Sequence, residues 1–277
     1  MAAPPLAALS SLAQTLLIPL YLRARETQRP DALVRDERAA ALVQQLNIAP
    51  AEVADAQVED EMQVALLLRS REFDRRARTF LAHGPGAVVV HLGCGLDQRF
   101  ERVDDGQVEW YDLDLPEVIG LRRQLLGAGG PRQHLVAGSA LDPAWHGAVT
   151  TRPGQPVLLL AEGLFMFFTA AQAQACVAGC AQRFAGAELL FDAFSPFLVW
   201  ANNRRVARTG RGARCAWGLR DPRELEHWGP GAQLLDAWYP LEQPTPRLAR
   251  VRWVRWWPAL TRGLGVYRYQ LPERLEA

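Results

Sequence analysis

The sequence lacks the features that mark several classes of protein. Only 4 of its 277 residues are cysteine, too few for the disulfide framework of a secreted protein in a chain of this length. Their positions, 94, 176, 180 and 215, combine with no histidine at the spacing of a zinc site, so no bound metal is expected. The formal net charge is only +1, which gives no electrostatic reason to expect nucleic acid or an anionic membrane as a partner.

Long hydrophobic runs are missing as well. Residues 1–20 are apolar, but they contain Pro4, Pro5 and Pro19 and no basic residue. They therefore fit neither a signal peptide nor a membrane span, which needs about 20 apolar residues. A hydrophobic content of 49% nevertheless supports a sizeable core. We expect a folded cytoplasmic protein that is a monomer or a homodimer.

What the sequence does contain is a strand that stops on a glycine turn. Residues 87–92 are apolar and mostly β-branched around His91, which predicts a strand covered on both faces. Gly93 and Gly95 follow, and they permit backbone conformations that a Cβ would block. Such a turn directs backbone N–H groups and a helix N-terminus at a polar ligand.

A second predicted strand, residues 108–112, leads into a pair of carboxylates, Asp112 and Asp114. A carboxylate at this place can accept hydrogen bonds from both hydroxyls of a ribose. The third glycine of the dinucleotide fingerprint is missing, because Gln98 stands at the matching position. This argues against NAD or FAD and favours a nucleoside cofactor without a pyrophosphate, such as S-adenosyl-L-methionine. The alternative is a plain tight turn with an incidental aspartate.

The rest of the pattern predicts an α/β fold. Residues 10–82 are helical in pattern, with Asp36 as a candidate N-cap. Strands are expected at 87–92, 108–112, 133–137, 156–161 and 187–193, and helices at 97–104, 116–126, 142–147 and 169–184. This alternation predicts a parallel sheet with helices on both faces and a site at the carboxyl ends of its strands.

We divide the chain, taken as a single domain over residues 1–277, into four parts. These are an N-terminal helical cap (1–85), a cofactor-binding core (86–196), a helical insertion that covers the active site (197–246) and a terminal β-hairpin (247–277). The hairpin is expected to pair 248–257 with 264–271, which gives a seven-stranded sheet. Five parallel strands followed by a hairpin is the order of the class I (Rossmann-like) methyltransferases.

Several motifs resemble one family. Residues 92–100 (LGCGLDQRF) and 110–118 (WYDLDLPEV) are similar to the leucine carboxyl methyltransferase superfamily, and most similar to its bacterial polyketide O-methyltransferases of the tetracenomycin type. Further matches lie at residues 69–74, 139–145 and 161–167, and the similarity runs from about residue 10 to 196. The resemblance implies a methyltransferase that uses S-adenosyl-L-methionine and releases S-adenosyl-L-homocysteine.

The resemblance also implies roles for residues. Gly93 and Gly95 would line the methionine part of the cofactor, Asp112 or Asp114 the ribose, and Ser139 and Ala140 the adenine. Arg69 and Arg71 would pair with the methionine carboxylate, and Glu162 would face the amino group or the transfer site. The predicted cofactor-binding set is Arg69, Arg71, Gly93, Cys94, Gly95, Asp112, Asp114, Leu115, Ser139, Ala140 and Glu162. Candidate catalytic residues are Glu162 and, on the first helix, Tyr21 and Arg25.

The acceptor is expected to be a small molecule with a carboxyl or phenolic oxygen. A carboxylate is already a nucleophile near neutral pH, whereas a phenol would benefit from a general base, with His134, His146 and His227 as candidates. Arginines in the insertion indicate an anionic substrate or simply a solvated face: Arg204, Arg205, Arg208, Arg211 and Arg214. Three alternatives stay open, namely a methyltransferase for protein C-terminal carboxyl groups, an NAD-dependent oxidoreductase, and a non-catalytic binding protein of the same fold.

Overall fold

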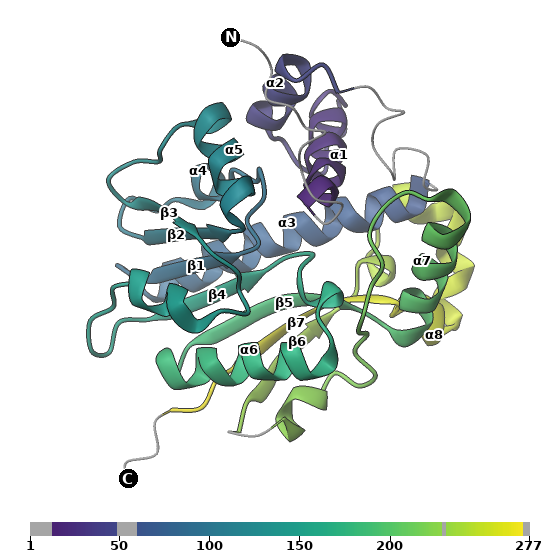
Figure 1. Ribbon diagram of the computed structural model, residues 1–277. Helices are drawn as coiled ribbons and strands as arrows, with labels where there is room; N and C mark the ends of the chain where they lie inside the picture. Colours follow the sequence, from purple (N-terminus) through teal and green to yellow (C-terminus); the bar gives the residue numbers. More distant parts are fainter. Residues whose placement is uncertain (1–12, 49–59, 229–230, 274–277) are drawn as a thin grey trace.

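The computed structural model describes residues 13–48, 60–228 and 231–273. Within them, seven strands form one sheet in the order β3-β2-β1-β4-β5-β7-β6 (Figure 1). The strands are β1 (Val88–Leu92), β2 (Glu109–Asp114), β3 (Gln133–Ala137), β4 (Val157–Ala161), β5 (Glu188–Phe194), β6 (Gln233–Trp238) and β7 (Leu264–Gln270). The strands predicted at 87–92, 108–112, 133–137, 156–161 and 187–193 are confirmed as β1 to β5.

The central strand fixes where a ligand can bind. β1 pairs in parallel with β2 on one side and with β4 on the other, so the order in which the chain adds strands reverses at β1. In a parallel sheet such a reversal of strand order opens a crevice at the carboxyl ends of the strands. All five residues of β1 are buried, as expected for a strand covered on both faces.

Helices cover both faces of the sheet. On one face α3 (Asp60–His83) packs Phe73 and Leu81 against Val89 of β1, beside α4 (Arg99–Val103). On the other face α6 (Ala170–Arg183) packs Cys180 against Val90. Neighbouring residues of one strand thus enter separate cores, which is the period-two pattern of a strand buried on both sides.

A third cluster joins the N-terminal part to the sheet. Helices α1 (Leu17–Thr27), α2 (Glu37–Gln45) and α5 (Pro116–Leu126) pack together through Leu20, Leu42 and Leu121 (Figure 1). Asp36 is the N-cap of α2, and its side chain accepts a hydrogen bond from the Ala39 backbone N–H at 2.9 Å. The part before the sheet is therefore a set of helices joined by loops, and the N-cap predicted at Asp36 is confirmed. The start of the predicted helical region, at residue 10, lies outside the described residues.

The predicted terminal hairpin is wrong in one of its strands. Residues 246–256 form a 3-10 helix, followed by α8 (Pro258–Thr261), instead of the strand expected at 248–257. β7 pairs with β5 on one edge and with β6 on the other. β6 comes from the segment assigned to the helical insertion, and α7 (Pro196–Thr209) supplies the helical part of that segment. β6 escapes detection because it is a mostly exposed edge strand whose register shifts between Leu234 and Asp236, so it has no regular alternation.

No helix in the described ranges is long and apolar enough to cross a membrane.

Candidate functional site

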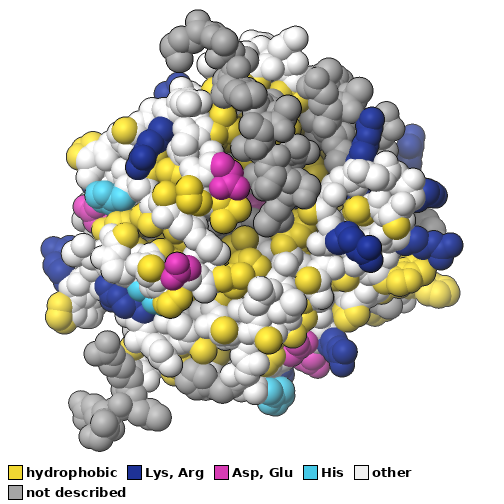
Figure 2. Space-filling model, in the orientation of Figure 1, with side chains coloured by type: hydrophobic (Ala, Val, Ile, Leu, Met, Phe, Trp, Pro, Cys, Tyr) yellow, Lys and Arg dark blue, Asp and Glu magenta, His cyan; other side chains and the backbone are white. Residues whose placement is uncertain are grey.

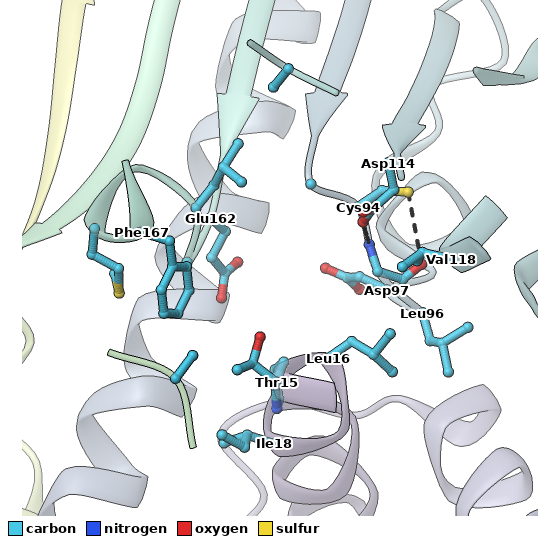
Figure 3. Close-up of a pocket in the computed structure, with 18 of the residues that line it drawn as sticks. Thr15, Leu16, Ile18, Cys94, Leu96, Asp97, Asp114, Val118, Glu162 and Phe167 are labelled. Carbon is cyan, nitrogen blue, oxygen red and sulfur yellow. Dashed lines mark hydrogen bonds between the residues drawn. The ribbon is translucent and has the colours of Figure 1, made fainter. Parts of the chain in front are cut away.

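A cavity of about 380 Å³ lies at the carboxyl ends of β1, β2 and β4 (Figure 3). One side, the turn side, is lined by residues 93–97, 113–115 and 138–141, which lie at the carboxyl ends of β1, β2 and β3. The other side, the α7 side, is lined by Met166, Phe167, Asn202, Arg205, Ala213 and Cys215. Residues of α1 and α3 complete the wall, and the volume falls in the range of small-molecule sites, about 300–1,000 Å³.

The glycine turn is anchored on the end of β2. The backbone N–H groups of Gly93 and Cys94 donate to the Leu113 carbonyl at 2.8 and 3.1 Å. Gly93 and Gly95 have φ of 67° and 52°, the left-handed region that favours glycine. A Cβ on Gly93 would also lie 3.1 Å from a methyl of Leu164, so a larger residue would both strain the turn and crowd the cavity.

The two aspartates of β2 have different surroundings. Asp114 lines the cavity, and its carboxylate accepts from the backbone N–H groups of Gly95 and Leu115, both at 2.7 Å. Burial raises the pKa of Asp114 despite these two hydrogen bonds. Asp112 is fully buried and does not line the cavity; it accepts from Arg122 at 2.8 Å and from Trp110 Nε1 at 2.9 Å. Of the pair, only Asp114 can meet a ligand in the cavity.

Glu162, which follows β4, belongs to a buried network of charges. Its carboxylate lies 2.9 Å from Nη2 of Arg69 and also accepts from Arg99, which is itself fully buried. Arg69 in turn donates to Asp192 of β5 at 2.8 Å. Burial opposes ionisation of Glu162, but the charges of Arg69 and Arg99 outweigh it and lower the Glu162 pKa. This group is therefore an ionised carboxylate held in place.

A second carboxylate, Asp97, faces the same space from the glycine turn. Figure 3 shows the side chains of Asp97 and Glu162 directed into one open region. Asp97 is 8% exposed and lies 2.8 Å from Arg102, 3.2 Å from Arg99 and 3.5 Å from Arg23 of α1. These arginines overcome the burial penalty and hold the Asp97 pKa well below its ordinary value. Two ionised carboxylates, each paired with arginines, thus reach the cavity here, and their oxygens can accept hydrogen bonds from an amino group of a ligand.

Most of the predicted cofactor-binding residues meet at this cavity. Those that line it are Arg69, Gly93, Cys94, Gly95, Asp114, Leu115, Ser139, Ala140 and Glu162. Asp97 and Arg99 were not predicted as site residues. Both lie in the motif at 92–100, where a pair of opposite charges next to a glycine turn could have indicated a role in the site. Asn202 and Arg205 were also missed as lining residues, because which face of a helix meets the cavity depends on packing.

Four predicted site residues lie away from the cavity. Asp112 is the first, as described above. Arg71 is exposed, because two residues further along α3 from Arg69 is more than half a turn around the helix. Arg25 is exposed and donates to Gln63 at 3.3 Å, and Tyr21 packs with the α1, α2 and α5 cluster. The catalytic roles expected for Tyr21 and Arg25 thus have no support in their positions.

The candidate general bases are distant as well. His134 pairs with Glu109 at 2.8 Å on β3, His146 packs against Trp145, and neither these nor His227 lines the cavity. His91 does line it, but this side chain is only 1% exposed and its Nδ1 lies 3.3 Å from Asp112. His91 is therefore a buried residue of β1, a strand predicted to be covered on both faces.

The described residues fit a nucleoside cofactor with a cationic amino-acid tail. A glycine turn with left-handed backbone angles lies beside Asp114, and two ionised carboxylates face the adjoining space. Asp114 and the Gly93–Gly95 turn would hold the ribose and the methionine part, with Ser139 and Ala140 near the base.

Comparison with known proteins agrees with this geometry. The family model described as leucine carboxyl methyltransferase matches residues 17–181. The chain is 32% identical to a tetracenomycin polyketide synthesis O-methyltransferase of Streptomyces glaucescens, over 90% of both chains. It is 28% identical to an S-adenosyl-L-methionine-dependent methyltransferase of Gibberella zeae, over 89% of this chain and 88% of the relative. A DUF574 family protein of Streptomyces avermitilis shares the fold, with a TM-score of 0.58 at 15% identity, over 91% of this chain and 97% of that one.

Proposed function

Because the chain belongs to the leucine carboxyl methyltransferase family and is an S-adenosylmethionine-dependent methyltransferase, we propose that it methylates an oxygen of a small molecule, with a carboxylate as the preferred acceptor. A relative that matches over 90% of both chains is named for polyketide synthesis, which supports a polyketide-like or similar secondary metabolite as the substrate. It also weighs against a protein C-terminus as the acceptor. Gln98 in place of the third glycine weighs against NAD.

The observation that carries the proposal is the lack of a general base among the described residues that line the α7 side. The titratable groups there are Arg205 and Cys215, and burial raises the pKa of Cys215 to about 11, so its thiol stays protonated at neutral pH. Glu162, at the border of this side, forms ion pairs with Arg69 and Arg99, which lower its pKa and make it a weak base. A carboxylate acceptor fits this wall, since it is ionised at neutral pH without help.

The chain's own contribution to the reaction is binding and alignment. The bound cofactor would supply an electrophilic methyl group on a sulfonium. Asp97 and Glu162 would fix its cationic part, while Phe167 and Met166 exclude water from the acceptor. Holding two reactants in line in a dry site is sufficient for a large acceleration, because it removes the entropy cost of their meeting.

A phenolic oxygen is the second candidate, and one observation favours it. Arg205 places a cation on the α7 side, and a nearby positive charge would stabilise a phenolate.

The test uses the purified protein with deuterium-labelled S-adenosylmethionine and a panel of flat aromatic acids and phenols. Mass spectrometry detects a labelled product, and mild alkali distinguishes a methyl ester, which hydrolyses, from a methyl ether, which does not. We expect alkali-labile products from the acids. Alkali-stable products alone would make the phenol the acceptor, and transfer to neither class would contradict the proposal.

A further inference from the structure

Arg122 of α5 lies behind the glycine turn. On the face shown in Figure 2 the basic side chains stand mainly at the rim, whereas the Arg122 side chain is only 1% exposed. Its Nη1 donates to the backbone carbonyls of Gly95 and Asp97, at 3.0 and 2.7 Å. Burying a guanidinium costs free energy unless its N–H groups find partners, so these two bonds constrain the chain strongly. One side chain thus holds residues 95–97 from behind.

The sheet holds Arg122 in turn. Its Nη2 donates to Oδ2 of Asp112 at 2.8 Å, and Asp112 of β2 is itself fully buried. The same carboxylate accepts from Trp110 Nε1 at 2.9 Å and from Gln133 Nε2 of β3 at 2.7 Å. The guanidinium is therefore fixed by β2 and β3 as well as by its own helix, and it does not depend on the turn for its position.

The segment that Arg122 holds carries two parts of the candidate site. The Gly95 backbone N–H donates to the Asp114 carboxylate at 2.7 Å, and the Asp97 side chain is directed into the cavity (Figure 3). The start of the turn is bound to the end of β2, as described above, so Arg122 constrains its second half. A glycine has the widest choice of backbone conformations, so a hydrogen bond to the Gly95 carbonyl removes more freedom than it would elsewhere.

We propose that Arg122 is a positioning residue for the cofactor: it holds residues 95–97 in the conformation in which Asp114 meets the ribose and Asp97 the methionine part. Arg122 does not line the cavity and so acts only through the turn. A turn that is ordered in advance removes the entropy cost of ordering it when the ligand binds. Asp112, one of the two aspartates expected at the ribose, then serves the site indirectly, by anchoring Arg122. The inference rests on the use of S-adenosylmethionine and not on the identity of the acceptor.

The experiment measures cofactor binding separately from stability. S-adenosylhomocysteine is titrated calorimetrically into wild type, Arg122→Met and Arg122→Lys. Arg122→Met should weaken binding by about tenfold, the equivalent of ordering the backbone of one residue on binding. Arg122→Lys keeps the charge without the paired donors and should give an intermediate affinity. Because Arg122→Met leaves the Asp112 carboxylate buried without its charge partner, the double variant Asp112→Asn/Arg122→Met removes both charges and should show the same loss of affinity in a folded protein.

The turn itself can be observed by NMR in protein made with isotope-labelled glycine. The amide signals of Gly93 and Gly95 should shift or broaden in the free double variant and return toward their wild-type positions when S-adenosylhomocysteine is bound. A residue that only adds stability would leave both signals unchanged in the folded protein, so unchanged signals would overturn the inference.

Two control variants complete the test. Arg123→Met removes the neighbouring, exposed arginine of α5 and should change neither affinity nor stability. Leu81→Ala leaves a gap in the core at the end of α3 that leads into β1, on the opposite edge of the sheet from the cavity. It should lower the unfolding temperature while the affinity stays that of the wild type.

The outcomes separate this inference from the proposed function. Wild-type affinity in the folded double variant would overturn the inference, and so would a loss of affinity in Leu81→Ala that follows its loss of stability. A wild-type protein that binds S-adenosylhomocysteine but methylates no acceptor would contradict the proposed function alone. Failure of the wild type to bind S-adenosylhomocysteine would overturn both.

Discussion

Two aspartates in one strand show how much depends on a shift of two residues. Asp112 and Asp114 lie on the same face of β2, so periodicity cannot separate them. The register does: Asp112 pairs with His91 inside the sheet, whereas β1 ends at the pair Leu92 and Leu113, one residue before Asp114. Asp114 therefore reaches past the end of β1 to the glycine turn. The sequence narrowed the expected ribose-binding position to this pair, and the strand pairing places only Asp114 at the cavity.

We predict that Asp112→Asn lowers stability without removing the cofactor site. The substitution leaves Arg122 buried without its counter-charge, and breaking such a pair costs about 3–5 kcal/mol of unfolding free energy. Urea unfolding at pH 7 measures the loss. The surface variant Asp31→Asn, whose carboxylate pairs with Arg29 in solvent, should change stability by less than about 0.5 kcal/mol.

The same variant gives a prediction for pH. Burial disfavours the charged form of Asp112, but the positive charge of Arg122, the nearby ring of His91 and a hydrogen bond from Trp110 lower its pKa to about 2. The unfolded chain has a pKa of about 3.9, so ionised Asp112 contributes its full stability above about pH 4 and loses it as the pH falls through 2. The difference between wild type and Asp112→Asn should shrink between pH 4 and pH 2. A difference that stays constant over this range would show that the carboxylate charge is not its cause.

At the scale of elements, the parallel part of the sheet was predictable and its edge was not. Strands β1 to β5 have continuous apolar runs, because both of their faces are covered. β6 is an edge strand with a shifted register, and exposed edge strands carry little hydrophobic signal. The segment at 248–257 showed a short alternation of arginine with apolar residues but forms a 3-10 helix. Local alternation in a short segment does not reveal which partner strand is available.

Helix α6 offers a test confined to one element. It begins with a capping box, in which the Thr169 hydroxyl accepts from the Gln172 N–H at 3.2 Å and Gln172 Oε1 accepts from the Thr169 N–H at 2.8 Å. Thr169→Ala should cost about 1 kcal/mol of unfolding free energy. Thr79→Ala, at an exposed position within α3, removes a hydroxyl that is not a cap and should cost less. Equal losses in the two variants would mean that the cap does not stabilise the helix.

At the scale of the whole molecule, the site exists because distant segments meet. The cavity takes residues from α1, α3, the ends of the central strands and α7, which are spread from Thr15 to Cys215. The turn side could be predicted because its residues stand in short motifs. The network of Arg23, Asp97, Arg99, Arg102 and Glu162 could not, since a charged residue looks solvated until packing buries it. Which residues of α7 line the cavity depends on how that helix is rotated about its axis, and the sequence alone does not determine this rotation.

The buried cysteines test how tightly the cavity wall is packed. All four are free and buried, and Cys94 and Cys215 line the cavity. Burial raises the pKa of both thiols, so the reactive thiolate is scarce at neutral pH. We predict that a thiol reagent such as Ellman's titrates no cysteine in the native protein within minutes and all four in guanidinium. Rapid reaction of a native thiol would show that the cavity wall opens more than the fold implies.

The central claim is that this cavity binds S-adenosylmethionine through Asp114. Calorimetric titration of wild type, Asp114→Asn and the exposed control Glu101→Gln with S-adenosylmethionine measures it directly. Asp114→Asn should weaken binding by at least about tenfold, as loss of a charge-assisted hydrogen bond does, while thermal unfolding shows an intact fold. Glu101→Gln should bind like the wild type. An unchanged affinity in Asp114→Asn, or no binding by the wild type, would contradict the account.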